Sequence, residues 1–119
     1  MRVITGTARG RRLKELAGME TRPTTDRVKE GLFNIIQFDI EGRAVLDLFA
    51  GTGQLGIEAL SRGAASAVFV DQRKEAARLV EENLKLTGLA GQGRVVCGDA
   101  MGFFPAGAVS RLKWSLKIE

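Results

Sequence analysis

A glycine-rich turn gives this sequence its clearest chemical signal. The segment from Asp47 to Gly56 reads DLFAGTGQLG, and it lies where an apolar run gives way to a helical one. Glycines at positions 51 and 53 permit positive φ angles and let a ligand approach bare backbone. The helix that follows offers free N–H groups and the positive end of its dipole. The segment therefore predicts a binding site for a polar ligand.

Two classes of cofactor satisfy the spacing of this turn. Gly51, Gly53 and Gly56 match the G-x-G-x-x-G dinucleotide fingerprint, and Asp71 follows Gly51 by twenty residues. Asp47 argues against a dinucleotide, because its carboxylate would repel a pyrophosphate at the turn but attract the ammonium and sulfonium groups of S-adenosylmethionine. The sequence thus favours S-adenosylmethionine, and a nicotinamide or flavin dinucleotide is the alternative.

Acidic residues at two further strand ends would complete such a site. Asp71 ends the run AVFVD, where its carboxylate can accept hydrogen bonds from ribose hydroxyls. Asp99 ends the run RVVCGD, where its side chain and the backbone around it could hold adenine. The carboxyl ends of parallel strands meet in one crevice, so we expect Asp47, Asp71 and Asp99 to face one ligand. Asp71 or Asp99 could alternatively be only a helix cap.

Short β-rich runs alternate with helical runs between residues 43 and 104. The order β-α-β-α-β predicts a parallel sheet with right-handed crossovers. Gly63 and Gly88 stand where the two helices should end. This α/β segment is the half of the chain expected to hold the cofactor.

A smaller unit is expected to precede the sheet. Residues 2–5 and 11–16 flank a glycine-containing turn and predict a β-hairpin within residues 1–20. Residues 21–39 predict a linker and then a helix from residue 26 to about 38, because Pro23 disfavours helix just before it and the next polar residues can cap one. Its apolar face should comprise Val28, Leu32, Ile35 and Ile36.

Positive charge is concentrated at the front of the chain. Residues 1–30 carry eight Lys or Arg against four Asp or Glu, whereas residues 31–119 carry ten of each, and the net charge is +4. A basic first quarter on a neutral body is typical of a surface that docks nucleic acid, although a solvated basic face is the simpler interpretation. The hairpin should display Arg9, Arg11, Arg12 and Lys14.

Composition excludes several kinds of chemistry. The 119 residues suit one domain, and they contain one cysteine and no histidine. An internal disulfide, a Ser-His-Asp triad and a histidine-based zinc site are therefore excluded, and we expect no metal. Cys97 is expected to be a small core residue. The sequence has no long apolar run and no apolar stretch of a signal peptide, so we expect a cytoplasmic protein without a membrane partner.

Several segments together resemble a known enzyme family. The chain resembles the RsmD-like family of 16S ribosomal RNA (guanine-N2) methyltransferases over residues 1 to about 104. The resemblance implies an S-adenosylmethionine methyltransferase with a Rossmann-like fold. Such an enzyme would transfer a methyl group to the exocyclic amine of a guanine in small-subunit ribosomal RNA. The segments that carry it are MRVI at 1–4, TRPTTDRVKE at 21–30, LFN at 32–34, DLFAGTG at 47–53, LG at 55–56, EALSRG at 58–63 and EN at 82–83.

The resemblance also implies roles for individual residues. The methionine end of the cofactor would contact Asp47, Phe49, Gly51 and Gly53, with Asp71 at the ribose and Asp99 and Ala100 at the adenine. The RPTTD segment lies beside the cofactor and the RNA in this family. That position carries Arg22, Thr24 and Thr25 over as residues beside the cofactor and the RNA. Arg27 is a further candidate for RNA contact because of its charge.

The end of the chain departs from the family pattern. Family members continue to a fourth strand that ends in Asp- or Asn-Pro-Pro-Tyr, whose oxygens orient the target amine toward the methyl donor. Pro23 and Pro105 are the only prolines here, so this sequence contains no such motif. We therefore expect a truncated or frameshifted form that has no catalytic acceptor residues and is inactive as written. A small basic RNA-binding module without catalysis is the alternative function.

The unmatched tail, residues 105–119, has a pattern of its own. Leu112, Trp114, Leu116 and Ile118 alternate with polar residues, which favours a strand with one apolar face. A sheet of three strands would leave its central strand with an open edge. We expect either that the tail covers this edge or that two chains pair across it as a homodimer.

Overall fold

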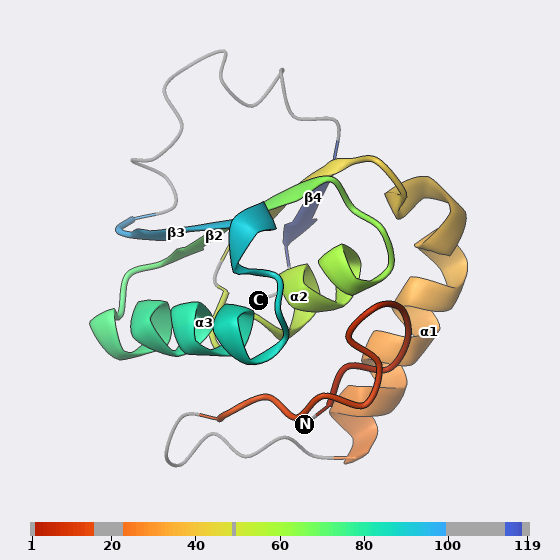
Figure 1. The fold of residues 1–119 in the computed structure, drawn as a ribbon, viewed down its shortest axis with the longest axis horizontal. Coiled ribbons are helices and arrows are strands. Elements are labelled where there is room, and N and C mark those ends of the chain that lie inside the picture. The colour runs from red at the N-terminus through yellow and green to blue at the C-terminus, as the bar shows by residue number, and fades with distance from the viewer. Residues whose placement is uncertain (1, 16–22, 49, 100–113, 118–119) are drawn as a thin grey trace.

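The computed structural model describes residues 2–15, 23–48, 50–99 and 114–117, with side chains described in these ranges except at 23–28, 36–38, 48 and 114–117. Three helices and four strands, joined by one 3-10 turn, make up the described fold (Figure 1). In chain order they are α1 (Pro23–Ile40), β1 (Ala44–Leu48), α2 (Gln54–Ser61), β2 (Ser66–Asp71), α3 (Lys74–Leu86), η1 (Ala90–Gln92), β3 (Gly93–Cys97) and β4 (Trp114–Lys117).

The four strands form one parallel sheet in the order β3-β2-β1-β4. This order confirms the predicted β-α-β-α-β unit. It also confirms that the tail contributes a strand, because β4 pairs with β1 in the register Val45↔Trp114 to Leu48↔Lys117. The edge of β1 is thus covered within one chain, and pairing of two chains is not needed to cover it.

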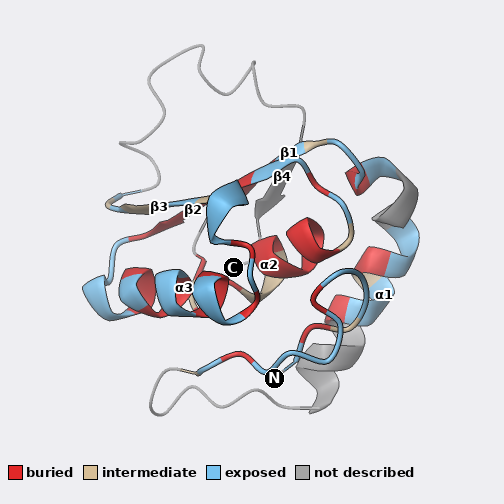
Figure 2. Cartoon of the chain, viewed as in Figure 1, coloured by how far each residue is buried: buried red, intermediate tan, exposed pale blue. Residues whose placement is uncertain are grey.

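The helices α2 and α3 cover the sheet and bury the core. Figure 2 shows buried residues along α2 and on the side of α3 that faces the strands, with exposed residues on the outer side of α3. Phe69, Ile57 and Val80 are fully buried between these layers. Gly56 allows the close approach of α2 to β2, because a Cβ there would lie 2.3 Å from the Phe69 ring. Gly63 and Gly88, both with positive φ, follow the two helices as predicted.

The first helix differs from its prediction in its start and at one position of its predicted apolar face. It begins at Pro23 rather than near residue 26, because proline is well suited to the first turn of a helix, where its missing N–H costs nothing. Among the helix side chains that the structure describes, Lys29, Phe33 and Ile40 are buried, whereas Ile35 is 80% exposed. Of the predicted apolar face, Leu32 packs against the core and Ile35 does not, while the side chains at 28 and 36 lie outside the described ones. Hydrophobicity alone could not predict that the helix buries Lys29, which has an anionic partner.

Residues 2–15, which bend and turn at residues 5–10, form a looped segment that we call the N-terminal arm. The predicted hairpin is reduced to one antiparallel bridge, Arg2↔Arg12, and to the backbone hydrogen bonds Val3 N to Arg11 O and Gly10 N to Val3 O. The arm lies against α1, α2 and α3 rather than pairing along its length (Figure 1).

Two smaller findings complete the fold. Cys97 is exposed, not part of the core, because β3 is an edge strand and its last residue lies at the rim. None of the helices in the described part of the chain is both long enough and apolar enough to cross a bilayer.

Candidate cofactor site

The glycine-rich turn connects β1 to α2 as predicted. Gly51 and Gly53 adopt φ angles of 60° and 81°, in the left-handed region that glycine tolerates best. The turn is closed by a hydrogen bond from Gly53 N to Ala50 O at 2.8 Å, and Ala50 N continues the sheet pairing by donating to Val70 O at 2.9 Å. The chain therefore leaves the sheet sharply at the carboxyl ends of β1 and β2.

The two glycines of this turn have different surroundings. A Cβ at Gly51 would meet no atom within 4 Å, so this backbone is open to an approaching ligand. A Cβ at Gly53 would lie 3.1 and 3.2 Å from the two methyl groups of Val80. Gly53 thus serves the packing of the turn against α3, whereas Gly51 leaves space beside the backbone.

Asp71 ties this turn to the next strand end. Its Oδ2 accepts a hydrogen bond from Gly51 N at 3.0 Å, and its Oδ1 accepts one from Arg73 N at 2.9 Å. The guanidinium of Arg73 adds two more, from Nε to Oδ1 and from Nη2 to Oδ2, both at 3.2 Å. Burial alone would raise the pKa of Asp71, but the hydrogen bonds from Arg73 and Gly51 outweigh it and hold the pKa below its usual value.

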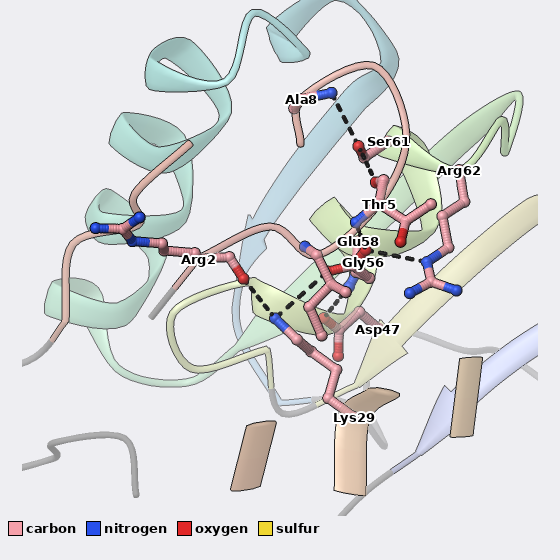
Figure 3. Close-up of polar contacts among 10 residues, drawn as sticks. Arg2, Thr5, Ala8, Lys29, Asp47, Gly56, Glu58, Ser61 and Arg62 are labelled. Carbon is pink, nitrogen blue, oxygen red and sulfur yellow. Dashed lines mark hydrogen bonds and ion pairs between the residues drawn. The ribbon is translucent and has the colours of Figure 1, made fainter. Parts of the chain in front are cut away.

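Asp47 is more deeply enclosed than an acid that meets a ligand in open solvent. It is 2% exposed, and its Oδ2 accepts a hydrogen bond from Gly56 N at 3.1 Å (Figure 3). The pKa of Asp47 is raised to about 8, mainly by burial, with the Gly56 bond opposing the rise and the charge of Asp71 adding to it. At neutral pH this carboxyl is mainly protonated, and a cation placed beside it would favour release of the proton.

The third strand end lies next to Asp71. β2 and β3 pair in the register Asp71↔Cys97, and Gly98 N donates to Asp71 O at 3.0 Å. Asp99, which follows directly, is exposed. The structure therefore brings Asp71 and Asp99 to one rim of the sheet beside the turn, while Phe49 and Ala100 lie outside the described residues.

Only some of the residues predicted to contact RNA are described by the structure. Arg9, Arg11, Arg12 and Lys14 are all exposed on the N-terminal arm. Arg22 and the side chains of Thr24, Thr25 and Arg27 lie outside the described part of the structure.

A buried ionic cluster that sequence reasoning missed holds the arm in place. Glu58 is fully buried on α2, where its two oxygens accept hydrogen bonds from Ile4 N at 2.8 Å and Thr5 N at 3.1 Å. Lys29 Nζ and Arg62 Nε approach the same carboxylate at 3.4 and 3.0 Å (Figure 3). An acid inside the otherwise apolar stretch of α2 was the signal that could have revealed this cluster.

Two neutral side chains fasten the arm at further points. Ser61 Oγ donates to Thr5 O at 2.7 Å and accepts from Ala8 N at 3.0 Å. Asn83, which is fully buried on α3, accepts from Lys14 N at 2.7 Å and donates to Lys14 O at 3.0 Å. Its amide also donates to Thr52 O at 2.9 Å, so one residue links the arm to the glycine-rich turn.

Comparison with known proteins assigns the chain to a family. The family described as "Conserved hypothetical protein 95" matches residues 1–112. The chain belongs to this family. It is 52% identical over 100 residues to "Putative rRNA methyltransferase YlbH" of Bacillus subtilis, covering 84% of this chain and 54% of that protein. It is 45% identical over 103 residues to "Ribosomal RNA small subunit methyltransferase D" of Escherichia coli, covering 87% and 52%.

Solved structures agree on the fold of this family member. "Putative methyltransferase yhhF from Escherichia coli" aligns with a TM-score of 0.76 at 45% identity, over 87% of this chain and 56% of that one. A "SAM Dependent Methyltransferase from Agrobacterium tumefaciens" aligns at 0.59 and 33% identity, over 70% and 27%. The fold is therefore the Rossmann-like fold of S-adenosylmethionine-dependent methyltransferases. The chain spans about half the length of the curated relatives it matches.

Proposed function

We propose that this chain is the cofactor-binding half of an S-adenosylmethionine-dependent ribosomal RNA methyltransferase. The observation that carries the proposal is the hydrogen bond between Gly51 N and the Asp71 carboxylate, which joins the open glycine turn to an acid on the neighbouring strand. The open backbone of the turn allows close approach of a nucleoside that carries a charged amino-acid tail, and the acid beside it can accept hydrogen bonds from the ribose hydroxyls. The family's methyltransferase names support the same assignment.

The residues present fit this cofactor in chemistry. Gly51 offers close backbone approach, and Asp71 offers carboxylate oxygens suited to ribose hydroxyls. Asp47 is a proton-holding carboxyl that becomes an anionic partner if a cation binds beside it. Asp99 and Ala100 complete the adenine end in this proposal, and Phe49 lies between Asp47 and the turn in sequence. The cofactor itself would supply an electrophilic methyl group on a sulfonium.

We propose the N2 amine of a guanine in 16S ribosomal RNA as the acceptor, with the small ribosomal subunit as partner in the cytoplasm. The exposed basic residues of the arm supply phosphate contacts, to which Arg22, Thr24 and Arg27 add. With two separated prolines, this sequence holds no Pro-Pro acceptor motif. Methyl transfer by this chain alone is therefore expected to be absent, while cofactor binding remains.

Calorimetric titration with S-adenosylmethionine and S-adenosylhomocysteine tests the proposal. Binding should be retained in Asp39→Asn, which alters an exposed acid on α1, and weakened at least tenfold in Asp71→Asn, which removes a ribose acceptor. Circular dichroism melts would verify that each variant is folded. Failure of the folded wild-type chain to bind either compound would overturn the proposal for this chain.

A second function, RNA binding without catalysis, is favoured by one observation. The arm that carries Arg9, Arg11 and Arg12 is fixed to the body by buried bonds, so these charges are held in a defined arrangement. Binding through phosphates should fall steeply between about 50 and 200 mM salt. RNA affinity that is independent of salt, or equal in a variant with all three arginines changed to glutamine, would exclude this function.

A further inference from the structure

The acid proposed to hold the ribose is already fully engaged in this structure. A carboxylate has about four acceptor positions. Asp71 receives four hydrogen bonds: two from backbone N–H groups, of Gly51 and Arg73, and two from the Arg73 guanidinium. Ribose hydroxyls can therefore reach this carboxylate only if some of these donors leave.

The four donors differ in how easily they can leave. The two N–H groups belong to the turn and to the start of α3, and they are fixed by backbone that also carries the sheet and helix. The Arg73 side chain is 46% exposed, whereas that of Asp71 is 8% exposed. An ion pair with a half-exposed guanidinium contributes little net free energy, because water and salt compete for that cation.

We propose that Arg73 is a specificity-determining residue that competes with the cofactor ribose for Asp71 and must swing away when the cofactor binds. The inference rests on the proposed function. The backbone donors keep the carboxylate in position throughout, so the competition concerns the two acceptor positions that the guanidinium fills. Ligands that offer two good donors to Asp71 displace the guanidinium, and ligands without them do not.

This competition lowers the apparent affinity of the cofactor. Replacing Arg73 with methionine keeps the aliphatic stem but removes the donors, so S-adenosylhomocysteine should bind about two- to fivefold more tightly to Arg73→Met. Salt screens the ion pair, so the affinity of the wild-type chain should rise relative to the variant as ionic strength increases.

Calorimetry on the full chain with three proteins tests the inference: the wild type, Arg73→Met and Arg78→Met, a control change at an exposed arginine of α3, the helix that Arg73 precedes. Each would be titrated with S-adenosylhomocysteine and with its 2′,3′-dideoxy analogue. We expect the gain in Arg73→Met only, and only for the ligand with ribose hydroxyls. A merely structural role for Arg73 would change both ligands alike.

Three outcomes would overturn the inference. Equal or weaker binding of S-adenosylhomocysteine to Arg73→Met would show that the guanidinium does not compete. An equal gain for the dideoxy analogue would show that the effect does not act through the ribose. Absence of binding to all three folded proteins would reject the proposed function itself, and this inference with it, which distinguishes that failure from the first two.

Discussion

Two carboxylates, Glu58 on α2 and Asp71 at the end of β2, each accept two backbone N–H groups and contact cations, but their surroundings differ. Glu58 accepts two backbone N–H groups from the arm and contacts two cations, Lys29 and Arg62. Asp71 accepts two backbone N–H groups, from the turn and the start of α3, and contacts one cation, Arg73. The cations at Glu58 have side chains 1% and 5% exposed, whereas that at Asp71 is 46% exposed.

The difference in exposure means that the contacts of Glu58 are permanent, whereas the contact between Arg73 and Asp71 can be exchanged. Buried charges that lose a partner cannot recover hydration, so the Glu58 cluster is expensive to open. An exposed guanidinium that leaves Asp71 is rehydrated at once, so that contact can be exchanged for a ligand. The chain thus places its rigid polar cluster where the arm is fastened and its exchangeable one at the rim where the cofactor is proposed to bind.

The strongest test of this contrast is Glu58→Gln. The variant would leave Lys29 and Arg62 buried without an anion, which should reduce the free energy of unfolding by about 3–5 kcal/mol. Urea denaturation monitored by circular dichroism would measure the loss. Glu82→Gln is the matched control, because its partner Lys14 is exposed. A loss below about 1 kcal/mol in Glu58→Gln would show that the cluster does not fasten the arm.

The second test acts on the arm where it touches α2. A Cβ at Gly6 would lie 1.8 Å from Ser61 O, and φ is +98° there, whereas Gly10, with φ of +82°, has nothing within 4 Å of the added atom. Gly6→Ala should therefore cost about 2–4 kcal/mol and Gly10→Ala about 1 kcal/mol. Thermal unfolding of both variants would measure the two losses of stability. Equal losses would mean that the arm moves away freely.

The third test concerns the proton on Asp47. The folded chain holds this proton up to about pH 8, whereas an unfolded aspartate releases it near 3.8. The contribution of Asp47 to stability is therefore fully present below about pH 4 and is lost as pH rises toward 8, by about 1.4 kcal/mol per pH unit.

Asp47→Asn removes this dependence and keeps an oxygen for the Gly56 N–H. Between about pH 6 and pH 8 the variant should gain about 2 kcal/mol over the wild type in denaturant titrations. Effects of acids that do not interact with Asp47 are common to both proteins and cancel in the difference, and only the smaller coupling to Asp71 does not. Parallel stability curves would indicate that Asp47 is ionised in the folded chain.

The smallest effect is expected at the exposed tie between the arm and α3. The ion pair of Lys14 Nζ with Glu82 is 3.2 Å long, with both side chains more than half exposed. Glu82→Gln should change the unfolding free energy by less than about 1 kcal/mol. Asn83→Ala should cost about 1–3 kcal/mol, because it removes three hydrogen bonds of a fully buried amide. A larger loss of unfolding free energy in Glu82→Gln than in Asn83→Ala would show that the exposed Lys14–Glu82 ion pair holds the arm.

Local features of the sequence predicted the sheet and its turn well. The hydrophobic periodicity, the spacing of the glycines and the acids at the strand ends are all patterns among residues close together in the chain. Gly51, Gly53 and Asp71 accordingly lie where these patterns placed them. The alternation in the tail likewise predicted the strand Trp114–Lys117. Local rules were sufficient to locate these elements because the pattern that marks each one lies within its own segment, although the strands are paired with distant ones.

Local sequence patterns could not predict the polar contacts between residues that are far apart in the chain. The buried stripe of α1 includes Lys29 because Glu58, twenty-nine residues later, neutralises it. The arm forms one bridge in place of a hairpin because Glu58, Ser61 and Asn83 satisfy backbone groups that a second strand would otherwise pair. Asp47 was expected to present an ionised carboxylate, and its deep burial depends on how closely α2 approaches β1.

The strand order also determines the sequence in which the sheet can assemble. β1 and β2 pair residues 22 apart, Ala44↔Ser66, whereas β1 and β4 pair residues 69 apart, Val45↔Trp114. Closing the longer loop costs more chain entropy and is slower. We therefore expect β1, β2 and β3 to form the folding nucleus and β4 to join last, so that β1, the strand leading into the glycine turn, is the last to gain both neighbours.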